Sequence, residues 1–267
     1  MKTFLFVIPE ERFKKNSHCF FTDYLSEFFK FDYLVILKNY EKEFLNTSFN
    51  SKEYDGIIFW GELFDTRLIE RVKNKNIIFV PMMDWVHTKK LVWWYRLRSI
   101  KIICFTKFLF NQLLKHNFNV SHFQYYKEAD TLPFEFKKEL NVFINREQLN
   151  SKETTILNKL FKNMPYKIHN KIRKDTHIFL SLNKFDGIEK EFIEAISLGL
   201  VAIGNSTPGF NDYVQHNMNG YLYKMDLALS INFSSISTLR LNSIEKNKIG
   251  AKRWKVLRKR LVDFLPI

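Results

Sequence analysis

Hydrophobic residues along this chain follow two alternating patterns. Short apolar runs are typical of buried strands, and they alternate with stretches in which apolar residues recur at helical spacing. The first such group predicts a strand at residues 3–8, a helix at 20–29 and a strand at 33–37. Further strands are expected at residues 56–60, 76–80, 101–105 and 120–125, with helices at 64–73, 91–98 and 109–116. Alternating strands and helices predict a parallel sheet with helices on both faces.

A second α/β unit follows a stretch of mixed charge around Pro133 that has no clear period. Its strands are expected at residues 140–145, 177–182, 201–204 and 221–223, and its helices at 153–163 and 188–198. We therefore predict two doubly wound, Rossmann-like domains at residues 1–130 and 140–245, with a linker at 131–139. Two such domains facing each other would place a ligand in a cleft at the carboxyl ends of their strands.

The composition narrows the class of protein. A hydrophobic content of 46% excludes a disordered chain. The 42 Lys and Arg against 28 Asp and Glu give a net charge of +14, which suits nucleic acid, an anionic membrane surface or an anionic small substrate. The sequence has no zinc-finger spacing, no aromatic RNA-binding motif and no basic zipper, so we expect no nucleic-acid partner.

Other features bear on the compartment. Cys19 and Cys104 lie far apart without a Cys-x-x-Cys spacing, as expected of buried thiols in a reducing compartment. The apolar run before Pro9 is too short for a signal peptide, and no uncharged run approaches the ~18 residues of a membrane-spanning helix. We therefore expect a cytoplasmic protein, with peripheral binding to the inner face of the cell membrane left open.

Glycine is scarce and unevenly placed. The chain has 8 glycines in 267 residues, about 3% against the usual ~7%. Five of them fall within 34 consecutive residues: Gly187, Gly199, Gly204, Gly209 and Gly220. In a chain so poor in glycine, each one is expected to meet a backbone requirement, which draws attention to this segment.

The segment at residues 185–199 has the arrangement of an anion site. A strand is expected to end near Leu182 and a helix to start near Gly187, so that backbone N–H groups and the positive helix end face a ligand. Asp186 would cap this helix, and Glu194 follows two turns later. On spacing alone, a simpler interpretation is favoured, in which Asp186 is only an N-cap, Glu194 is a surface residue and Gly199 ends the helix.

The residues of this segment also resemble a known family. Asp186-Gly187 through Gly199, then Gly209 and Asp212, then Asn219-Gly220, are similar to the signature of retaining glycosyltransferases of family 4 (glycosyl transferases group 1), which have the GT-B fold. That signature is a Glu-x7-Glu pair, a Gly-Gly-x-Pro-Glu turn and an Asn-Gly strand start. The resemblance places Asp186 and Glu194 on the two glutamates. It implies that Asp186 contacts the donor sugar and that Glu194 holds the nucleotide ribose.

The same match suggests further donor contacts at Gly187, Ile188, Glu189 and Glu191. Two positions depart from the family pattern. Asp186 is one methylene shorter than the usual glutamate, and Glu189 stands where the family usually has a second glycine. A side chain and a negative charge at Glu189 would alter the choice of donor or weaken its binding.

A second segment resembles the family's diphosphate clamp. Residues 142–146 end a predicted strand with Asn145-Arg146, where the family has Gly-Arg, and Lys152 follows six residues after the Arg. A diphosphate leaving group gains negative charge as the glycosidic bond breaks, and an Arg with a Lys can neutralise that charge without a metal. An Arg and a Lys at this spacing mean nothing by themselves. Their place after a strand and ahead of the carboxylate motif makes them candidates.

In the first domain the family often has a His just beyond the fourth strand, near the donor sugar. This sequence has Met83 or Asp84 at that place and His87 three residues later. Asp84 and His87 are therefore both candidates for contacts with the sugar or the acceptor. A His87 that forms only a local hydrogen bond within its loop is an equal alternative.

Two segments combine basic and aromatic residues, at 89–98 and at 252–265. The second belongs to a basic amphipathic helix expected at residues 246–267, which we expect to cross back to the first domain; it places Trp254, Leu257, Leu261 and Phe264 on one face. Such helices suit an anionic membrane surface, but the favoured alternative is that both segments pack their apolar faces on the fold.

These observations predict an α/β protein with the GT-B fold that transfers a sugar, with retention, from a nucleotide diphosphate donor to a glycan or lipid-linked acceptor. The resemblance suggests a bacterial surface polysaccharide or lipopolysaccharide as the product, and it requires no metal and no cofactor. Two alternatives remain: a nucleotide-sugar hydrolase or epimerase of the same fold, and a non-catalytic, basic membrane- or glycan-binding protein.

Overall fold

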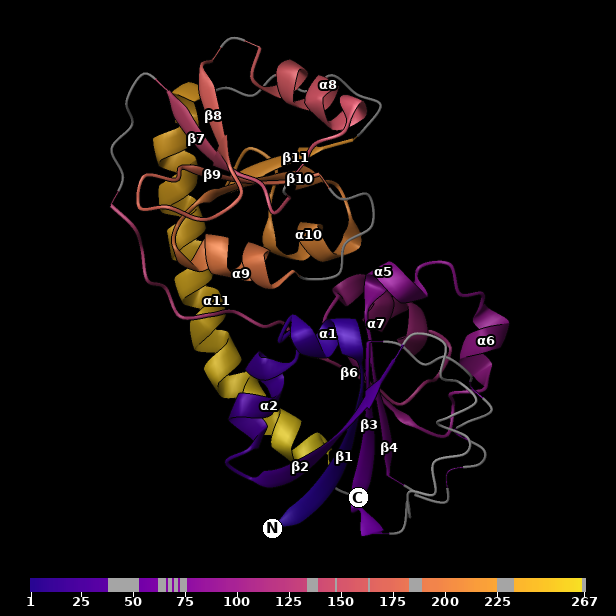
Figure 1. Ribbon diagram of the computed structural model, residues 1–267. Helices are drawn as coiled ribbons and strands as arrows, with labels where there is room; N and C mark the ends of the chain where they lie inside the picture. Colours follow the sequence, from indigo (N-terminus) through magenta and orange to yellow (C-terminus); the bar gives the residue numbers. More distant parts are fainter. Residues whose placement is uncertain are drawn as a thin grey trace. The chain divides into compact units, whose positions relative to one another are not determined.

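The computed structural model describes residues 1–37, 53–61, 66, 69, 72, 76–133, 139–146, 148–162, 164–182, 189–224 and 233–265 (Figure 1). The chain forms two compact units. Unit 1 is Met1–Phe123 together with Val256–Ile267, and unit 2 is Gln124–Lys255. The expected helix at residues 64–73 lies almost entirely outside the described residues.

Unit 1 is built on a six-stranded sheet in the order β2-β1-β3-β4-β5-β6, and every pair is parallel. Its strands are β1 (Lys2–Pro9), β2 (Phe29–Ile36), β3 (Gly56–Gly61), β4 (Ile77–Pro81), β5 (Lys101–Cys104) and β6 (Val120–His122). Its short helices are α1 (Glu10–Lys14), α2 (Cys19–Leu25), α5 (Met83–Val86), α6 (Leu91–Tyr95) and α7 (Lys107–Leu114). The predicted parallel sheet is thus confirmed for this unit.

Apolar side chains cover both faces of this sheet. On one face, Leu5, Val7 and Phe59 share a core with Trp94 of α6 and Leu113 of α7. On the other, the rings of Phe21 and Trp60 lie 5.2 Å apart, within an aromatic cluster that also includes Phe6 and Phe105. Helices therefore pack on both faces, as the alternating pattern predicts.

Unit 2 is built on a five-stranded parallel sheet in the order β11-β10-β9-β7-β8. Its strands are β7 (Leu140–Phe143), β8 (Tyr166–His169), β9 (Ile178–Ser181), β10 (Val201–Asn205) and β11 (Gly220–Tyr223). Its helices are α8 (Ser151–Leu160), α9 (Lys190–Ser197), α10 (Pro208–Tyr213) and the first part of α11 (Ile236–Phe264), preceded by the 3-10 turn η2 (Phe233–Ser235). One core lies under α8 and another under α9 and α10.

Helix α11 ends in unit 1, where polar contacts fix its last residues. The Asn76 side chain donates to the carbonyl oxygen of Leu265 at 2.9 Å, and Lys101 Nζ donates to that of Phe264 at 2.8 Å. The guanidinium of Arg258 lies 4.4 Å from the ring centre of Tyr24 on α2. Burial lowers the pKa of Lys101 at this contact.

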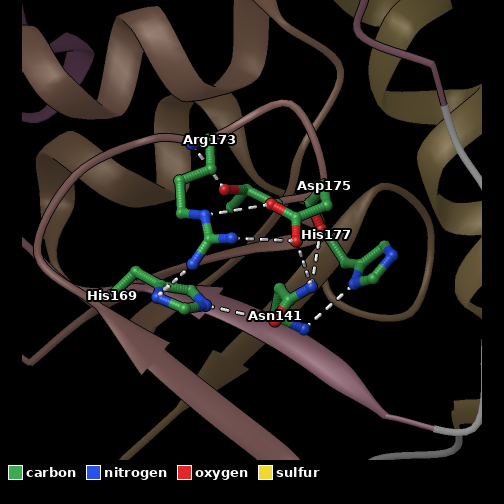
Figure 2. Close-up of polar contacts among 6 residues, drawn as sticks. Asn141, His169, Arg173, Asp175 and His177 are labelled. Atoms are coloured by element: carbon green, nitrogen blue, oxygen red, sulfur yellow. Dashed lines mark hydrogen bonds and ion pairs between the residues drawn. The ribbon is translucent and has the colours of Figure 1, made fainter.

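The connection from β8 to β9 crosses β7 in only residues 170–177, whereas parallel crossovers usually need a dozen or more residues and a helix. A closed ring of polar contacts holds this loop on the sheet (Figure 2). Arg173 donates to His169 Nδ1 at 3.2 Å, so the other ring nitrogen, Nε2, carries the proton that is donated to Asn141 Oδ1 at 3.1 Å. Asn141 Nδ2 donates to Asp175 at 3.1 Å, and Asp175 accepts from Arg173 at 3.2 Å.

Several elements differ from the sequence expectation, and the short helices α1, α5 and α10 are among those not predicted. The helix expected at residues 20–29 ends at Leu25, because Phe29 already pairs with Lys2 in the sheet. Strand β8 was not predicted, since its edge position leaves two of its four residues exposed and removes the apolar run. Helix α11 begins at Ile236, well before the basic segment. The buried side of α11 before the basic segment includes the polar residues Ser243 and Asn247, which interrupt the apolar pattern expected of a helix.

Candidate functional site

Each sheet has one place where the chain reverses its direction of strand addition, and in α/β proteins such switch points bind ligands at the carboxyl ends of the strands. In unit 2 the switch point lies between β7 and β9. Arg146 follows β7, and helix α9 follows β9. The predicted donor residues therefore belong to the two connections that flank this switch point.

Arg146 is held in place by Glu153. The two side chains form an ion pair in which the Glu153 carboxylate is buried and the guanidinium is about one-third exposed. Glu153 also closes a capping box at the start of α8: its carboxylate accepts from Asn150 N at 2.9 Å, while Asn150 Oδ1 accepts from Glu153 N at 3.0 Å. The helix start thus fixes the carboxylate, and the carboxylate orients the Arg.

Lys152 is the second residue of the same helix, and its side chain is exposed. A cation on a flexible stem therefore lies one position from the buried carboxylate that anchors Arg146. The two basic residues expected at a diphosphate thus lie on the connection that follows β7, where Glu153 orients Arg146 and Lys152 is exposed. Arg and Lys both form charge-assisted hydrogen bonds with phosphate oxygens.

Helix α9 carries the predicted carboxylates. Glu189 occupies its N-cap, the position expected of Asp186, and Glu191 lies in its first turn. Glu194 is half-buried, and among the described residues its carboxylate makes no hydrogen bond or ion pair. Phe192, Ile193 and Ile196 anchor the opposite side of the helix in the core. Asp186, Gly187 and Ile188 lie outside the described residues.

In unit 1 the switch point lies between β1 and β3. Arg12, on α1 after β1, forms an ion pair with Asp84, on α5 after β4. Gly61, at the end of β3, has a φ of +81°, and a Cβ added there would lie 3.6 Å from Arg12 Nε. The structure thus brings Asp84 to the switch point, with a partner that the sequence analysis did not identify.

His87 is placed differently from Asp84. Its Nδ1 donates to Met83 O at 3.1 Å across α5, and its exposed ring lines a cavity of about 350 Å³ between α5, α6 and α7. The sequence analysis gave a local hydrogen bond of His87 as an alternative to a ligand contact, and this hydrogen bond is present. The ring also faces a cavity that no sequence pattern indicated.

Arg12 and Glu153 are the two site residues that sequence reasoning missed. Glu153 had a signal: Asn150-x-x-Glu153 before an apolar helix is a capping box, and a helix start after a strand end lies at the sheet's carboxyl edge. The only sequence signal for Arg12 is that it follows the first strand. Charged residues on an exposed helix often form surface ion pairs, as Glu10 and Lys14 do on α1, so the charge of Arg12 alone did not indicate a functional site.

No family model and no curated protein matches this sequence. The fold is that of the GT-B glycosyltransferases. HepE of Anabaena, in a complex with UDP, superposes with a TM-score of 0.66 at 9% identity, covering 99% of both chains. Sucrose-phosphate synthase of Thermosynechococcus elongatus gives 0.65 at 8% identity, covering 98% of this chain and all of that one. The lipopolysaccharide outer core galactosyltransferase WaaB, in its apo form, gives 0.56 at 13%, with 94% and 95% covered.

Among the described residues, no group of three or more His, Cys, Asp or Glu side chains is arranged to hold a metal ion. Every helix in the described part of the chain is too short or too polar to cross a lipid bilayer.

Proposed function

We propose that this protein is a glycosyltransferase that moves a sugar from a nucleotide diphosphate donor to a glycan or lipid-linked acceptor, with retention and without a metal. The observation that carries the proposal is the switch point of unit 2. Arg146, oriented by Glu153, and the exposed Lys152 lie on the connection that follows β7, and the half-buried Glu194 lies on α9, which follows β9. These are the two connections at whose strand ends a ligand is expected.

Each residue has a role in the proposed reaction. The acceptor oxygen bonds to the anomeric carbon of the sugar, the bond from that carbon to the diphosphate breaks, and the acceptor proton passes to the leaving phosphate. Arg146 and Lys152 stabilise the charge that develops on the diphosphate. Glu194 accepts hydrogen bonds from the ribose, and Asp186 accepts them from the sugar. Gly187, Ile188, Glu189 and Glu191 line the donor.

Retention and the role of Asp186 rest on the resemblance of residues 186–220 to family 4. HepE and WaaB add support for a donor of the nucleotide-sugar class, since one is described in a complex with UDP and the other as a galactosyltransferase. Asp84 and His87 of unit 1 are proposed to contact the sugar or the acceptor. We further propose peripheral docking on an anionic membrane at the cytoplasmic face and a place in surface polysaccharide or lipopolysaccharide synthesis.

Donor turnover tests the proposal. Arg146→Ala and Glu194→Ala should each lower the turnover of the donor about 100-fold or more, as expected for a lost transition-state contact. Lys152→Ala should lower it as well, whereas Lys159→Ala, which removes an exposed lysine later on the same helix, should not. Turnover close to wild type in both Arg146→Ala and Glu194→Ala would disprove the assignment.

The alternatives give different results. A hydrolase or epimerase of this fold consumes a nucleotide sugar without any acceptor, so release of free or epimerised sugar in the absence of acceptor favours it. A non-catalytic binding protein shows no rise in thermal stability with any nucleotide diphosphate or nucleotide sugar, because a ligand that binds only the folded state must stabilise it. A thermal-shift screen therefore precedes the activity assay.

A further inference from the structure

The cavity between α5, α6 and α7 belongs to unit 1 and is separate from the Arg12–Asp84 pair. Its volume is about 350 Å³. Its walls are largely apolar, with Met83, Val86 and Trp94 on one side and Leu109 and Leu113 on the other. Engineered apolar cavities of ~150 Å³ already bind benzene, and small-molecule pockets start near ~300 Å³. The cavity is therefore large enough for a short aliphatic or isoprenoid segment.

The mouth of this cavity exposes apolar side chains to solvent. Phe108 of α7 is 48% exposed and Leu91 of α6 is 37% exposed, and both line the cavity. Beside them, Val92 is 68% exposed. An apolar cavity that continues into an exposed apolar rim is a surface that an inserted hydrocarbon chain would bury.

The titratable groups at the rim are basic, and Gln112 adds a neutral amide. Lys89, His87 and His116 line the cavity, and among the described residues no acidic side chain does so. From Trp85 to Lys127 the chain has eight Lys and Arg and no Asp or Glu in 43 residues, a stretch that includes every lining residue except Met83. The charge around the cavity thus complements an anion.

Lys89 is held at this rim by two aromatic rings. Its Nζ lies 4.3 Å from the ring centre of Trp85 and 5.6 Å from that of Trp93. Cation–π contacts of this kind fix the ammonium while leaving its N–H groups able to donate to a ligand. A phosphate at the cavity mouth would therefore meet a cation that is already in place.

We infer that this cavity binds a lipid phosphate: the hydrocarbon chain enters between α6 and α7, and the phosphate lies at Lys89, His87 and His116. This inference rests on the proposed function only in identifying the lipid phosphate as the anchor of the sugar acceptor. The binding itself does not depend on catalysis.

Dodecyl phosphate is the probe, and isothermal titration calorimetry on the full chain, below the micelle concentration, is the measurement. Saturable binding of one molecule is expected. Dodecyl maltoside, with the same chain and no charge, and inorganic phosphate, with the charge and no chain, should each bind at least about tenfold more weakly, because each lacks one of the two contacts. Equal binding of either compound overturns the inference.

Two exposed apolar residues of α7 provide a matched pair of variants. Phe108→Asp should weaken dodecyl phosphate about tenfold or more, because it places a negative charge and removes an apolar contact at the mouth. Leu114→Asp makes the same change at a residue that is 49% exposed on the same helix and does not line the cavity, so it should leave binding unchanged. Equal losses in the two variants, or none in Phe108→Asp, overturn the inference.

Further variants keep the test independent of folding and of the proposed function. Leu91→Asp replaces Phe108→Asp if the latter loses its circular dichroism, and Lys89→Gln should weaken the probe whereas Lys115→Gln should not. Nucleotide diphosphate binding is measured on the same samples. Binding of dodecyl phosphate without any nucleotide contradicts the proposed function and supports the lipid site. Binding of a nucleotide diphosphate together with no binding of dodecyl phosphate supports the proposed function and overturns the lipid site.

Discussion

Arg146 and Glu153 form an ion pair that joins the end of strand β7 to the first turn of helix α8. The carboxylate is buried and serves two contacts at once, because one oxygen accepts from Arg146 and the other from the backbone N–H of Asn150. The Arg that we place at the donor diphosphate is thus oriented by the helix start and not by its own backbone alone.

We expect Glu153→Gln to separate the orientation of Arg146 from its charge. The amide oxygen can still accept one hydrogen bond, but the ion pair is lost and Arg146 becomes less fixed. The kcat of donor turnover should fall about tenfold while the KM for the donor stays unchanged or falls, since the Arg then carries more available charge. Steady-state kinetics give both values.

Asn150→Ala is the control for Glu153→Gln. It removes the N-cap and should cost about 1 kcal/mol of stability without touching Arg146, so the kcat should remain close to wild type. Equal losses of kcat in the two variants would show that helix stability, and not the position of Arg146, determines the rate.

The ion pair between Arg12 and Asp84 lies at the switch point of unit 1 and predicts a coupled effect on transfer. Both side chains are partly exposed, so the pair should contribute less than about 1 kcal/mol to folding. Arg12→Ala and Asp84→Ala should therefore change the melting temperature little and lower transfer at least about tenfold, because each removes an oriented polar group from the site.

A double-mutant cycle on transfer rates measures the coupling between Arg12 and Asp84. Losses that are less than additive in the double variant are expected if the two residues act as one unit. Lys14→Ala, which removes the exposed pair with Glu10 on the same helix, is the matched control. If Lys14→Ala lowers transfer as much as Arg12→Ala does, the two residues have no special role.

Stability should fall as the pH drops from 6.5 toward 5.5. Burial lowers the pKa of His18, against a smaller opposing effect of Asp23, and burial together with Lys107 lowers the pKa of His122. Between the lowered folded pKa and the unfolded value of about 6.5, the unfolded chain binds more protons, so acid favours unfolding; above 6.5 the effect is absent. Melting temperatures across pH 5.5 to 8 measure it.

His122→Phe should reduce this pH dependence. The Nε2 atom of His122 is buried and has no hydrogen-bond partner among the described residues, and its ring packs 5.7 Å from that of Phe110, so an aromatic replacement fits the same surroundings. A melting temperature that rises on acidification between pH 6.5 and 5.5 in the native chain would contradict the sign of both shifts.

Local sequence patterns predicted the strands that are buried on both faces, and failed at the exposed edge strand β8 and at the polar buried residues of α11. Strands β1, β3 and β4 read as continuous apolar runs because both faces are covered. The glycine cluster also had a physical meaning: Gly199 has a φ of +78° after the last turn of α9, and a Cβ at Gly204 would lie 2.5 Å from the ring of Phe210. These requirements are local and therefore visible in the sequence.

The site was predictable only in part for a related reason. Arg146 follows a strand end, and Lys152 and Glu194 lie on helices that follow strands. These positions can be predicted from the order of elements along the sequence. The contacts of Arg146 with Glu153 and of Arg12 with Asp84 depend on side chains that come together only in the folded sheet. The cavity at Phe108 and Leu91 needs three helices to form, and no single helix indicates it.

The short crossover from β8 to β9 has a ring of polar contacts where a parallel crossover usually has a helix (Figure 2). We expect this ring to stabilise the loop. Asn141→Ala removes the residue that both donates to Asp175 and accepts from His169. The loss should cost about 1–3 kcal/mol, since it removes three side-chain hydrogen bonds that each contribute about 0.5–1.5 kcal/mol. Asn158→Ala removes an exposed hydrogen bond to Tyr166 and should cost less than about 1 kcal/mol.

Urea unfolding measures the free energy of unfolding of both variants. Amide hydrogen exchange should be faster at residues 170–177 in Asn141→Ala alone. Equal stability of the two variants would mean that the apolar contacts of the loop suffice to hold it.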